Sequence, residues 1–446
     1  NGGFAEISGR HALYARGRID LRAPAGRAGT VLFDPDDIQI VGGTGDGDDA
    51  DAANTTLDAS GTNATQGQVL FDATPNSPFL VYESEIEGTD ADIVLQANNN
   101  ITTNGTFGGG DLTLLVNRSL TLQTKNDLAS GIIDVSAIHL KTTNASITIQ
   151  AGTNATGAFK GDVSLGAVTT QTAGNVTVSS GGTGAITTLS GNITTAAGKV
   201  QFDGNVVLGA SVSLDTTAGN IVFGGTLNGT GNHTENLVLT AGTGNVSFSA
   251  AVGGSKTLGD VTINSAQNVQ ASAGFAAKSL TQSAGTGTTT FNGIDTSGLS
   301  AVAGGAVNLK SAGAIDVSGG TIVTSGGTAT GAGLDAGAVT LNSTGSTVTL
   351  GALTATGSAA ATSSAAAGGA GGVVTVSSGG GSTTLSGATI NTTGGAGDGA
   401  GAQGAGGNVS FTNAVVLAGA ETITTGASAG NIVFGGTLNG TGNHTE

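Results

Sequence analysis

From about residue 110 onward, the chain repeats one short pattern: an apolar residue, a small polar residue and a second apolar residue. Such alternation puts both apolar side chains on one face of a strand and the polar side chain on the other. Gly, Asn or Asp near each run supplies a turn. The pattern therefore predicts short, half-buried strands. The clearest lie at residues 120–122, 147–149, 163–165, 176–178, 237–239, 246–248, 261–263, 307–309, 339–341, 348–350, 374–376 and 409–411.

The spacing of these runs is too irregular for hairpins of one length, but it fits coils that carry two or three strands with variable corners. The four prolines, Pro24, Pro35, Pro75 and Pro78, all precede the runs, so no proline interrupts a backbone hydrogen-bond ladder there. Amphipathic helical stretches are absent from the sequence. The chain is therefore predicted to be an all-β parallel β-helix, or β-solenoid, with Gly/Ala-rich loop insertions.

A longer repeat overlies the short pattern. Residues 218–235 recur without change at 429–446, 211 positions later. The second copy differs from the first mainly by insertions around 357–372 and 394–407. Because insertions in a solenoid leave the stack as loops while the coils keep stacking, both are expected to be loops.

The repeat divides the chain into three expected parts. Residues 1–109 form an N-terminal solenoid segment, 110–235 a first repeat unit, and 236–446 a second, diverged unit that ends within a repeat. Since the chain starts at Asn1 and carries no signal peptide, we expect the natural protein to extend beyond it.

The composition requires a thin core. Of 446 residues, 81 are Gly, 13 are Phe and two are Tyr, and Trp, Cys and Met are absent. So few large side chains cannot fill several thick globular cores, whereas one layer of Val, Ile, Leu and Ala between close backbones can use them. Glycine-rich composition is also typical of disorder, but here the aliphatic residues are patterned rather than scattered.

The charge argues against a nucleic-acid partner. The net charge is −17, and the 13 Lys and Arg residues form no basic run after the first thirty positions. The lack of cysteine excludes disulfides, thiolate nucleophiles and Cys-based zinc sites. It is also compatible with secretion that needs no oxidative folding.

The first hundred residues carry a family resemblance. Residues 2–10 (GGFAEISGR), 19–43 (IDLRAPAGRAGTVLFDPDDIQIVGG) and 82–102, which contain YESEIEG and IVLQANNNIT, resemble filamentous haemagglutinin-like large exoproteins of two-partner secretion systems. Beyond residue 110 only the style of the repeats is similar. The Asn-Pro-Asn motifs of that family's secretion domain are absent from the chain, so its own export cannot be read from these residues.

The resemblance implies a right-handed parallel β-helix and export through an outer-membrane transporter partner. It also implies a secreted or cell-surface location of the Gram-negative type. The role that the resemblance implies is that of an adhesin, which acts in adhesion, in aggregation or in a biofilm matrix.

One acidic segment, residues 42–58, contains candidate metal ligands. Asp46, Asp48, Asp49 and Asp51 could surround a hard cation, and calcium suits carboxylate ligands. Their spacing matches neither the twelve-residue calcium loop nor the glycine-rich nonapeptide. A solvated acidic loop is the favoured interpretation, and no other cofactor is expected.

Catalytic chemistry is not predicted. Asp34, Asp36 and Asp37 could form paired carboxylates, but Pro35 among them favours a turn between strands. With no cysteine and no adjoining group of carboxylates, the histidines are expected in turns rather than in a metal site or triad. The four histidines are His11, His139, His233 and His444.

Glycosylation sequons are frequent in the chain. Asn228, Asn232, Asn439 and Asn443 are candidate sites at equivalent positions of the two repeats. Chance explains much of this frequency, because Asn, Ser and Thr are common here.

Stacked Asn, Ser and Thr residues supply the expected mechanism. Hydroxyl and amide ladders would run along the outside of the coils, with internal Asn ladders at corners. Surface glycans, a host or neighbouring cell surface, or further copies of the chain could each bind weakly at many coils. We expect an extracellular structural stalk or fibre that self-associates into fibres or bundles; the alternative is a carbohydrate-binding or polysaccharide-degrading β-helix. A flat, ice-binding type of Thr face is disfavoured, because Thr-x-Thr triplets do not recur at one coil spacing.

Overall fold

The computed structural model describes residues 4–8, 14–16, 30–34, 37–44, 68–70, 78–125, 131–153, 160–387 and 389–442. Within these ranges the helical segments are the α-helix α1 (Glu83–Gly88) and the 3-10 turn η1 (Gly108–Gly110). No helix there is long and apolar enough to cross a membrane. The chain divides into two compact units, Asn1–Gly225 and Thr226–Glu446.

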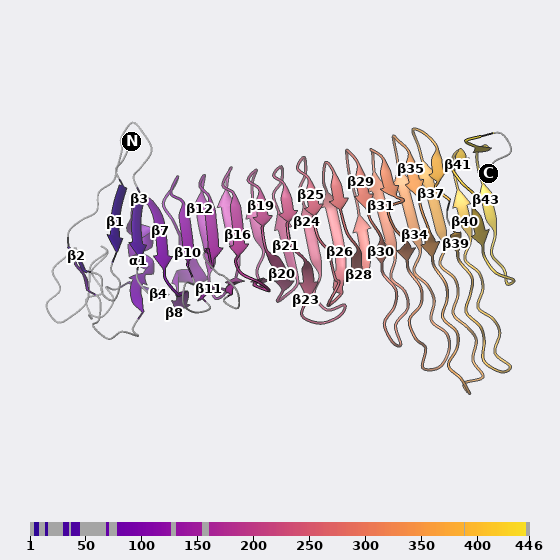
Figure 1. The fold of residues 1–446 in the computed structure, drawn as a ribbon, viewed down its shortest axis with the longest axis horizontal. Coiled ribbons are helices and arrows are strands. Elements are labelled where there is room, and N and C mark those ends of the chain that lie inside the picture. The colour runs from indigo at the N-terminus through magenta and orange to yellow at the C-terminus, as the bar shows by residue number, and fades with distance from the viewer. Residues whose placement is uncertain are drawn as a thin grey trace. The chain divides into compact units, whose positions relative to one another are not determined.

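The first unit is a stack of coils that visit three parallel sheets in turn (Figure 1). Sheet 1 contains β1 (Phe4–Ser8), β3 (Thr30–Asp34), β7 (Asp92–Ala97), β10 (Leu120–Thr124), β13 (Ile147–Ala151), β16 (Val176–Ser180), β19 (Val200–Phe202) and β22 (Ile221–Phe223). Sheet 2 contains β6 (Phe79–Tyr82), β4 (Asp37–Val41), β8 (Asn100–Asn104), β11 (Gly131–Val135), β14 (Gly161–Leu165), β17 (Ile186–Leu189) and β20 (Asn205–Leu208). Sheet 3 contains β9 (Asp111–Thr113), β12 (His139–Thr143), β15 (Val168–Gln171), β18 (Ile193–Thr195) and β21 (Val212–Asp215). An antiparallel pair, β2 (Tyr14–Arg16) and β5 (Gln68–Leu70), lies outside these sheets.

The second unit repeats this plan. Sheet 1 contains β25 (Val246–Phe248), β27 (Val269–Ala271), β29 (Thr289–Phe291), β32 (Ile315–Val317), β35 (Val348–Leu350), β38 (Thr383–Leu385), β41 (Val415–Leu417) and β44 (Leu438–Gly440). Sheet 2 contains β23 (Leu227–Gly229), β30 (Ile294–Asp295), β33 (Ile322–Val323), β36 (Leu353–Thr354), β39 (Thr389–Asn391) and β42 (Thr422–Thr424). Sheet 3 contains β24 (Leu237–Thr240), β26 (Leu258–Ser265), β28 (Phe275–Gln282), β31 (Val307–Ser311), β34 (Val339–Ser343), β37 (Val374–Ser378), β40 (Val409–Phe411) and β43 (Ile432–Phe434).

The core is the thin apolar layer that the composition predicts. In β10 the side chains of Leu120 and Leu122 are fully buried, and they lie in register with Ile147 and Ile149 of β13. Aromatic residues also stack from coil to coil; the rings of Phe202 and Phe223 are nearly parallel, with centroids 5.3 Å apart. All twelve predicted runs lie in strands. The prediction of an all-β parallel β-helix is confirmed.

Buried hydroxyl groups close the corners of the coils. In the first unit, Thr142, Thr170, Thr195 and Thr216 point inward near the end of sheet 3, and each donates to a backbone carbonyl across the corner. In the second unit, buried Ser311 and Ser343 at the end of sheet 3 donate to the carbonyls of Gly287 and Gly313, in the corner of the preceding coil, at 2.8 Å. These bonds satisfy backbone acceptors that the sharp corner would otherwise leave unpaired.

In the second unit, the four coils that contain β30, β33, β36 and β39 make an excursion between sheets 2 and 3. We call its two halves the outgoing legs (296–300, 324–331, 355–362 and 392–399) and the return legs (302–306, 332–338, 364–373 and 400–408). Legs of successive coils are hydrogen-bonded side by side. Gly326 donates to Thr356 at 3.0 Å between outgoing legs, and Gly371 donates to Ala405 at 2.8 Å between return legs. Figure 1 shows these legs as long unlabelled traces in orange and yellow.

The two layers of legs are also bonded to each other. The amide of Ser358 donates to Leu334 at 2.9 Å, and the amide of Gly395 donates to Gly369 at 2.8 Å. The predicted insertions therefore do leave the stack, but they form a hydrogen-bonded, two-layered slab rather than independent loops. The physical reason is glycine: without a Cβ, two backbones approach closely enough for their amides and carbonyls to meet.

Candidate functional site

Rows of polar side chains cover the outer faces of the sheets. In the first unit, Thr121, Thr148 and Thr177 stand in register on sheet 1, and Gln96 donates to Gln123 in a neighbouring row. Adjacent strands of a sheet are about 4.8 Å apart, so each row repeats one polar group at that spacing. This arrangement is the external ladder that the sequence predicts.

A longer row runs along sheet 3 of the second unit. Its members, in register from strand to strand, are Thr262, Thr281, Asn308, Thr340 and Thr375. An Asn ladder is present at a corner of the same unit, where the Asn268 side chain donates to Oδ1 of Asn245 at 2.8 Å. Such rows offer the same hydrogen bonds at every coil, which suits weak contacts that add along a partner's length.

One group of titratable residues lies on sheet 3 of the first unit. Asp111 Oδ2 accepts from Lys141 Nζ at 2.5 Å, and its Oδ1 lies 3.1 Å from Nδ1 of His139. His139 Nε2 in turn lies 2.9 Å from the Thr169 hydroxyl. The hydrogen bond from Lys141 keeps the pKa of Asp111 below its usual value, against the opposing effect of burial. Burial, followed by the Lys141 charge, lowers the pKa of His139.

These residues come from β9, β12 and β15, so the group links three successive coils. The order carboxylate, imidazole, hydroxyl is that of a hydrolytic triad. However, Thr169 lies inside a paired strand, where the backbone amides are used by the ladder and do not provide an oxyanion site. The group is best explained as a crosslink between coils. The expectation that His139 lies in a turn is wrong, because it lies in β12; His233 does lie in a turn, with a φ of 62°.

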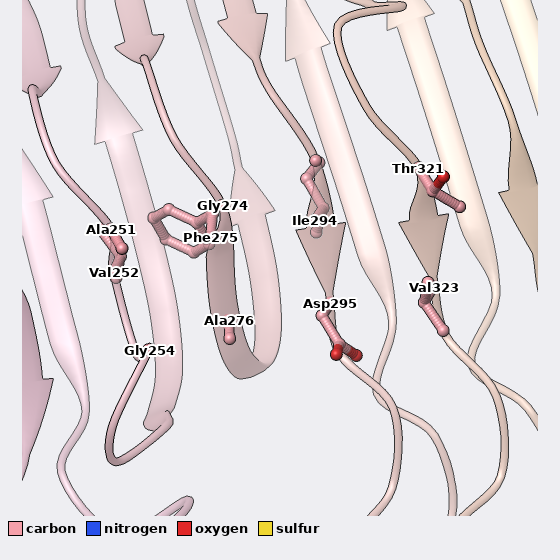
Figure 2. A pocket seen from close by; sticks show the side chains of 11 residues that line it. Ala251, Val252, Gly254, Gly274, Phe275, Ala276, Ile294, Asp295, Thr321 and Val323 are labelled. Carbon is pink, nitrogen blue, oxygen red and sulfur yellow. The ribbon is translucent and has the colours of Figure 1, made fainter.

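A groove of about 260 Å³ lies on the outer face of sheet 2 in the second unit (Figure 2). Small outward residues at successive coils, among them Ala251, Gly274 and Ala276, leave it open, and buried Phe275 and Ile294 lie beneath them. Its polar margin consists of Asp295 and Thr321. The sequence did not reveal this groove, because β30 and β33 are only two residues long and give no alternating pattern.

The predicted site residues are only partly placed. Asp46, Asp48, Asp49, Asp51 and Asn443 lie outside the described residues, so calcium binding by this acidic segment stays a prediction. Within the described ranges, no three His, Asp or Glu side chains are grouped as metal ligands would be.

The other glycosylation candidates lie at or near turns. Oδ1 of Asn228 accepts from the amide of Ser255 at 2.9 Å, and Oδ1 of Asn232 accepts from Thr257 at 3.1 Å. Asn439 is exposed on β44. Their modification stays a prediction.

Among the acidic residues that the structure describes in the second unit, Glu235 is the buried one. It accepts hydrogen bonds from the amide of Thr230 at 3.0 Å and from the hydroxyl of Thr234 at 2.6 Å, within one turn. Burial acts to raise the pKa of Glu235, but these bonds together outweigh it and the pKa lies below its ordinary value. The carboxylate therefore holds this turn in place.

Comparison with known proteins gives no relative: no family model, no curated protein and no solved structure matches the chain.

Proposed function

We propose that the chain is part of an extracellular structural stalk or fibre of an adhesin or matrix protein. The observation that carries the proposal is the in-register stacking: in each unit the strands of one coil pair in parallel with those of the next, and equivalent residues align in rows. A stack of this kind can be lengthened by adding coils, because each coil contacts only its neighbours. It would act through its length, its robustness and its repeated weak surface contacts.

The outer rows would supply the contacts. A single Thr or Asn gives a weak hydrogen bond in water, but a glycan chain or a cell surface that meets several rows at once gains by effective concentration. Both the family resemblance of the first hundred residues and the lack of cysteine support a secreted or cell-surface location. The resemblance also supports an outer-membrane transporter as the partner during export.

Immunogold electron microscopy of producing cells tests the proposal. Antibodies against the second unit should label material outside intact cells, and the label should be removed when the cells are treated with protease at a concentration that leaves cytoplasmic proteins untouched. Labelling confined to the cell interior, or to extracellular material without any fibrous or surface-attached form, would contradict it.

A carbohydrate-binding surface is the second candidate function, and the groove in Figure 2 is the observation that favours it. A sugar ring has apolar faces and hydroxyl edges, which suit an apolar floor with Asp295 and Thr321 at the margin. Gly274→Leu tests it, because an added Cβ at Gly274 meets no atom within 4 Å and the rest of the side chain would occupy the groove. Glycan-array binding that survives this substitution would remove the groove as the site.

A further inference from the structure

The two faces of the glycine-rich slab differ in chemistry. Outward-facing residues recur at every third position of the return legs, as at the exposed Ala367, the half-buried Ala370 and the exposed Val373, which is the period of a polyproline II helix. The backbone bonds from Gly333 to Ala367 and from Gly368 to Ala402 align the legs, so these positions form a grid. We call this grid the methyl face. Its members are Ala303, Ala306, Ala332, Asp335, Ala338, Ala367, Ala370, Val373, Ala402, Ala405 and Asn408.

On the outgoing legs, the row of residues nearest the sheets carries hydroxyl groups. Ser325 and Thr356 are hydrogen-bonded to each other at 3.0 Å, and Ser297 and Thr393 continue their row. The same backbone arrangement therefore carries a polar row on one side and an almost entirely apolar grid on the other. Solubility alone would favour polar residues on both sides, so the apolar grid needs an explanation.

The methyl face exposes a larger apolar group as well. Val373 is 47% exposed. The grid's single charged group, Asp335, uses one oxygen to accept from the amide of Ala370 at 2.6 Å. A partner for this face must therefore be flat, apolar and uncharged.

We propose that the methyl face binds the same face of a second copy of this chain. Glycines separate many of the grid positions along the legs, as Gly368 and Gly369 separate Ala367 from Ala370. The methyl groups of an identical face can pack into the space above these glycines. Each grid position covers roughly 45 Å². This is the product of the distance between positions along a leg, three residues of about 3.1 Å each, and the distance between legs, about 4.8 Å. The eleven positions then bury about 1,000 Å² over both copies, the lower limit for a specific interface.

The proposal deepens the stalk function and rests on it, because lateral pairing bundles neighbouring stalks. The slab is suited to pairing, since its hydrogen bonds hold the face rigid and little order is lost on binding. The net charge of −17 opposes association of two copies, so pairing should strengthen as salt screens that charge.

Sedimentation velocity of the full chain tests this directly, with two double variants matched in chemistry. Ala367→Glu with Ala402→Glu places two carboxylates in one row of the methyl face. Ala359→Glu with Ala396→Glu places two in a row of exposed alanines on the outgoing legs, also in adjacent coils. We expect concentration-dependent dimers of the unmodified chain, at least tenfold weaker association of the first variant, and less than a twofold change in the second.

Two results would overturn the proposal. One is a chain that stays monomeric up to the millimolar range in high salt. The other is association that both variants weaken equally or that neither affects, which would place self-association elsewhere on the stack. Neither result removes the stalk function, because the immunogold experiment does not depend on pairing.

Discussion

The backbone amide of Gly369 donates to the carbonyl oxygen of Ser358, 2.9 Å away, although the two residues lie on opposite legs of the same excursion. The carbonyl of Gly369 in turn accepts from Gly395 of the next coil at 2.8 Å. Hydrogen bonds of this kind run through the slab, from leg to leg and from coil to coil. Glycine is required there because the neighbouring backbone occupies the space that a Cβ would need.

We therefore expect Gly369→Ala to destabilise the second unit by about 2–3 kcal/mol, the cost of forcing an extra methyl group into a packed site. The added Cβ would overlap the Leu334 carbonyl. Hydrogen exchange of peptides from 355–373 should rise, and the thermal unfolding midpoint should fall. Gly331→Ala is the control, since nothing lies within 4 Å of its added Cβ. Equal effects of both substitutions would show that the slab is not closely packed.

A buried threonine provides a second prediction. Thr187 points into the core of the first unit with 1% of its surface exposed, and its hydroxyl has no hydrogen-bond partner. Thr187→Val should raise the free energy of unfolding by about 1 kcal/mol, because an unsatisfied buried hydroxyl is replaced by a methyl group of similar size. The measurement is chemical denaturation of the full chain.

Thr195→Val is the matched control for this prediction. Thr195 is equally buried, but its hydroxyl donates to the carbonyl of Gly198 at 2.5 Å. Its substitution should lower the free energy of unfolding by about 1–2 kcal/mol, since the corner carbonyl loses its donor. If both substitutions change stability in the same direction, hydrogen bonding does not explain the effect.

The fold was largely predictable, because the period-two pattern directly encodes which side chains face inward. Runs such as 176–178 and 374–376 carry that pattern with two aliphatic residues each, and all lie in strands. Strands whose inward residues are polar do not show this pattern. Thr383 of β38 is fully buried and bonds the Ser378 hydroxyl, a pairing that depends on the corner geometry.

The polar groupings were less predictable, because they form between residues one coil apart. Asp111 and His139 meet only because β9 and β12 are in register, and the irregular coil length hides that register in the sequence. The hydrogen-bonded slab was not predicted from the sequence for a related reason. Its glycines look like loop residues until the register shows that each faces another backbone, as Gly395 faces Ser358.

Calcium provides a prediction for the acidic segment at 42–58. Its carboxylates lack the spacing of known calcium loops, so we expect no heat in isothermal titration calorimetry of the full chain with calcium up to millimolar concentrations. A saturable isotherm that disappears in Asp46→Asn with Asp48→Asn would contradict this and would establish a binding site.

The last prediction concerns pH. Because the pKa of Glu235 is lowered in the folded chain, its hydrogen bonds stabilise the second unit fully above the ordinary value of 4.5, and this contribution is lost as the pH falls through the folded pKa. Glu235→Gln should therefore lower the thermal unfolding midpoint at pH 7, by an amount equivalent to about 1–3 kcal/mol. The difference from the unmodified chain should shrink as the pH falls below 4.5 and vanish once it is below the lowered pKa of folded Glu235, where Glu235 itself is protonated. Asp295→Asn is the control: its exposed carboxylate also accepts from a neighbouring amide and hydroxyl, at Ser297, but it is not enclosed by a turn. A difference between Glu235→Gln and the unmodified chain that stays constant from pH 3 to pH 7 would show that the substitution acts through shape rather than through charge.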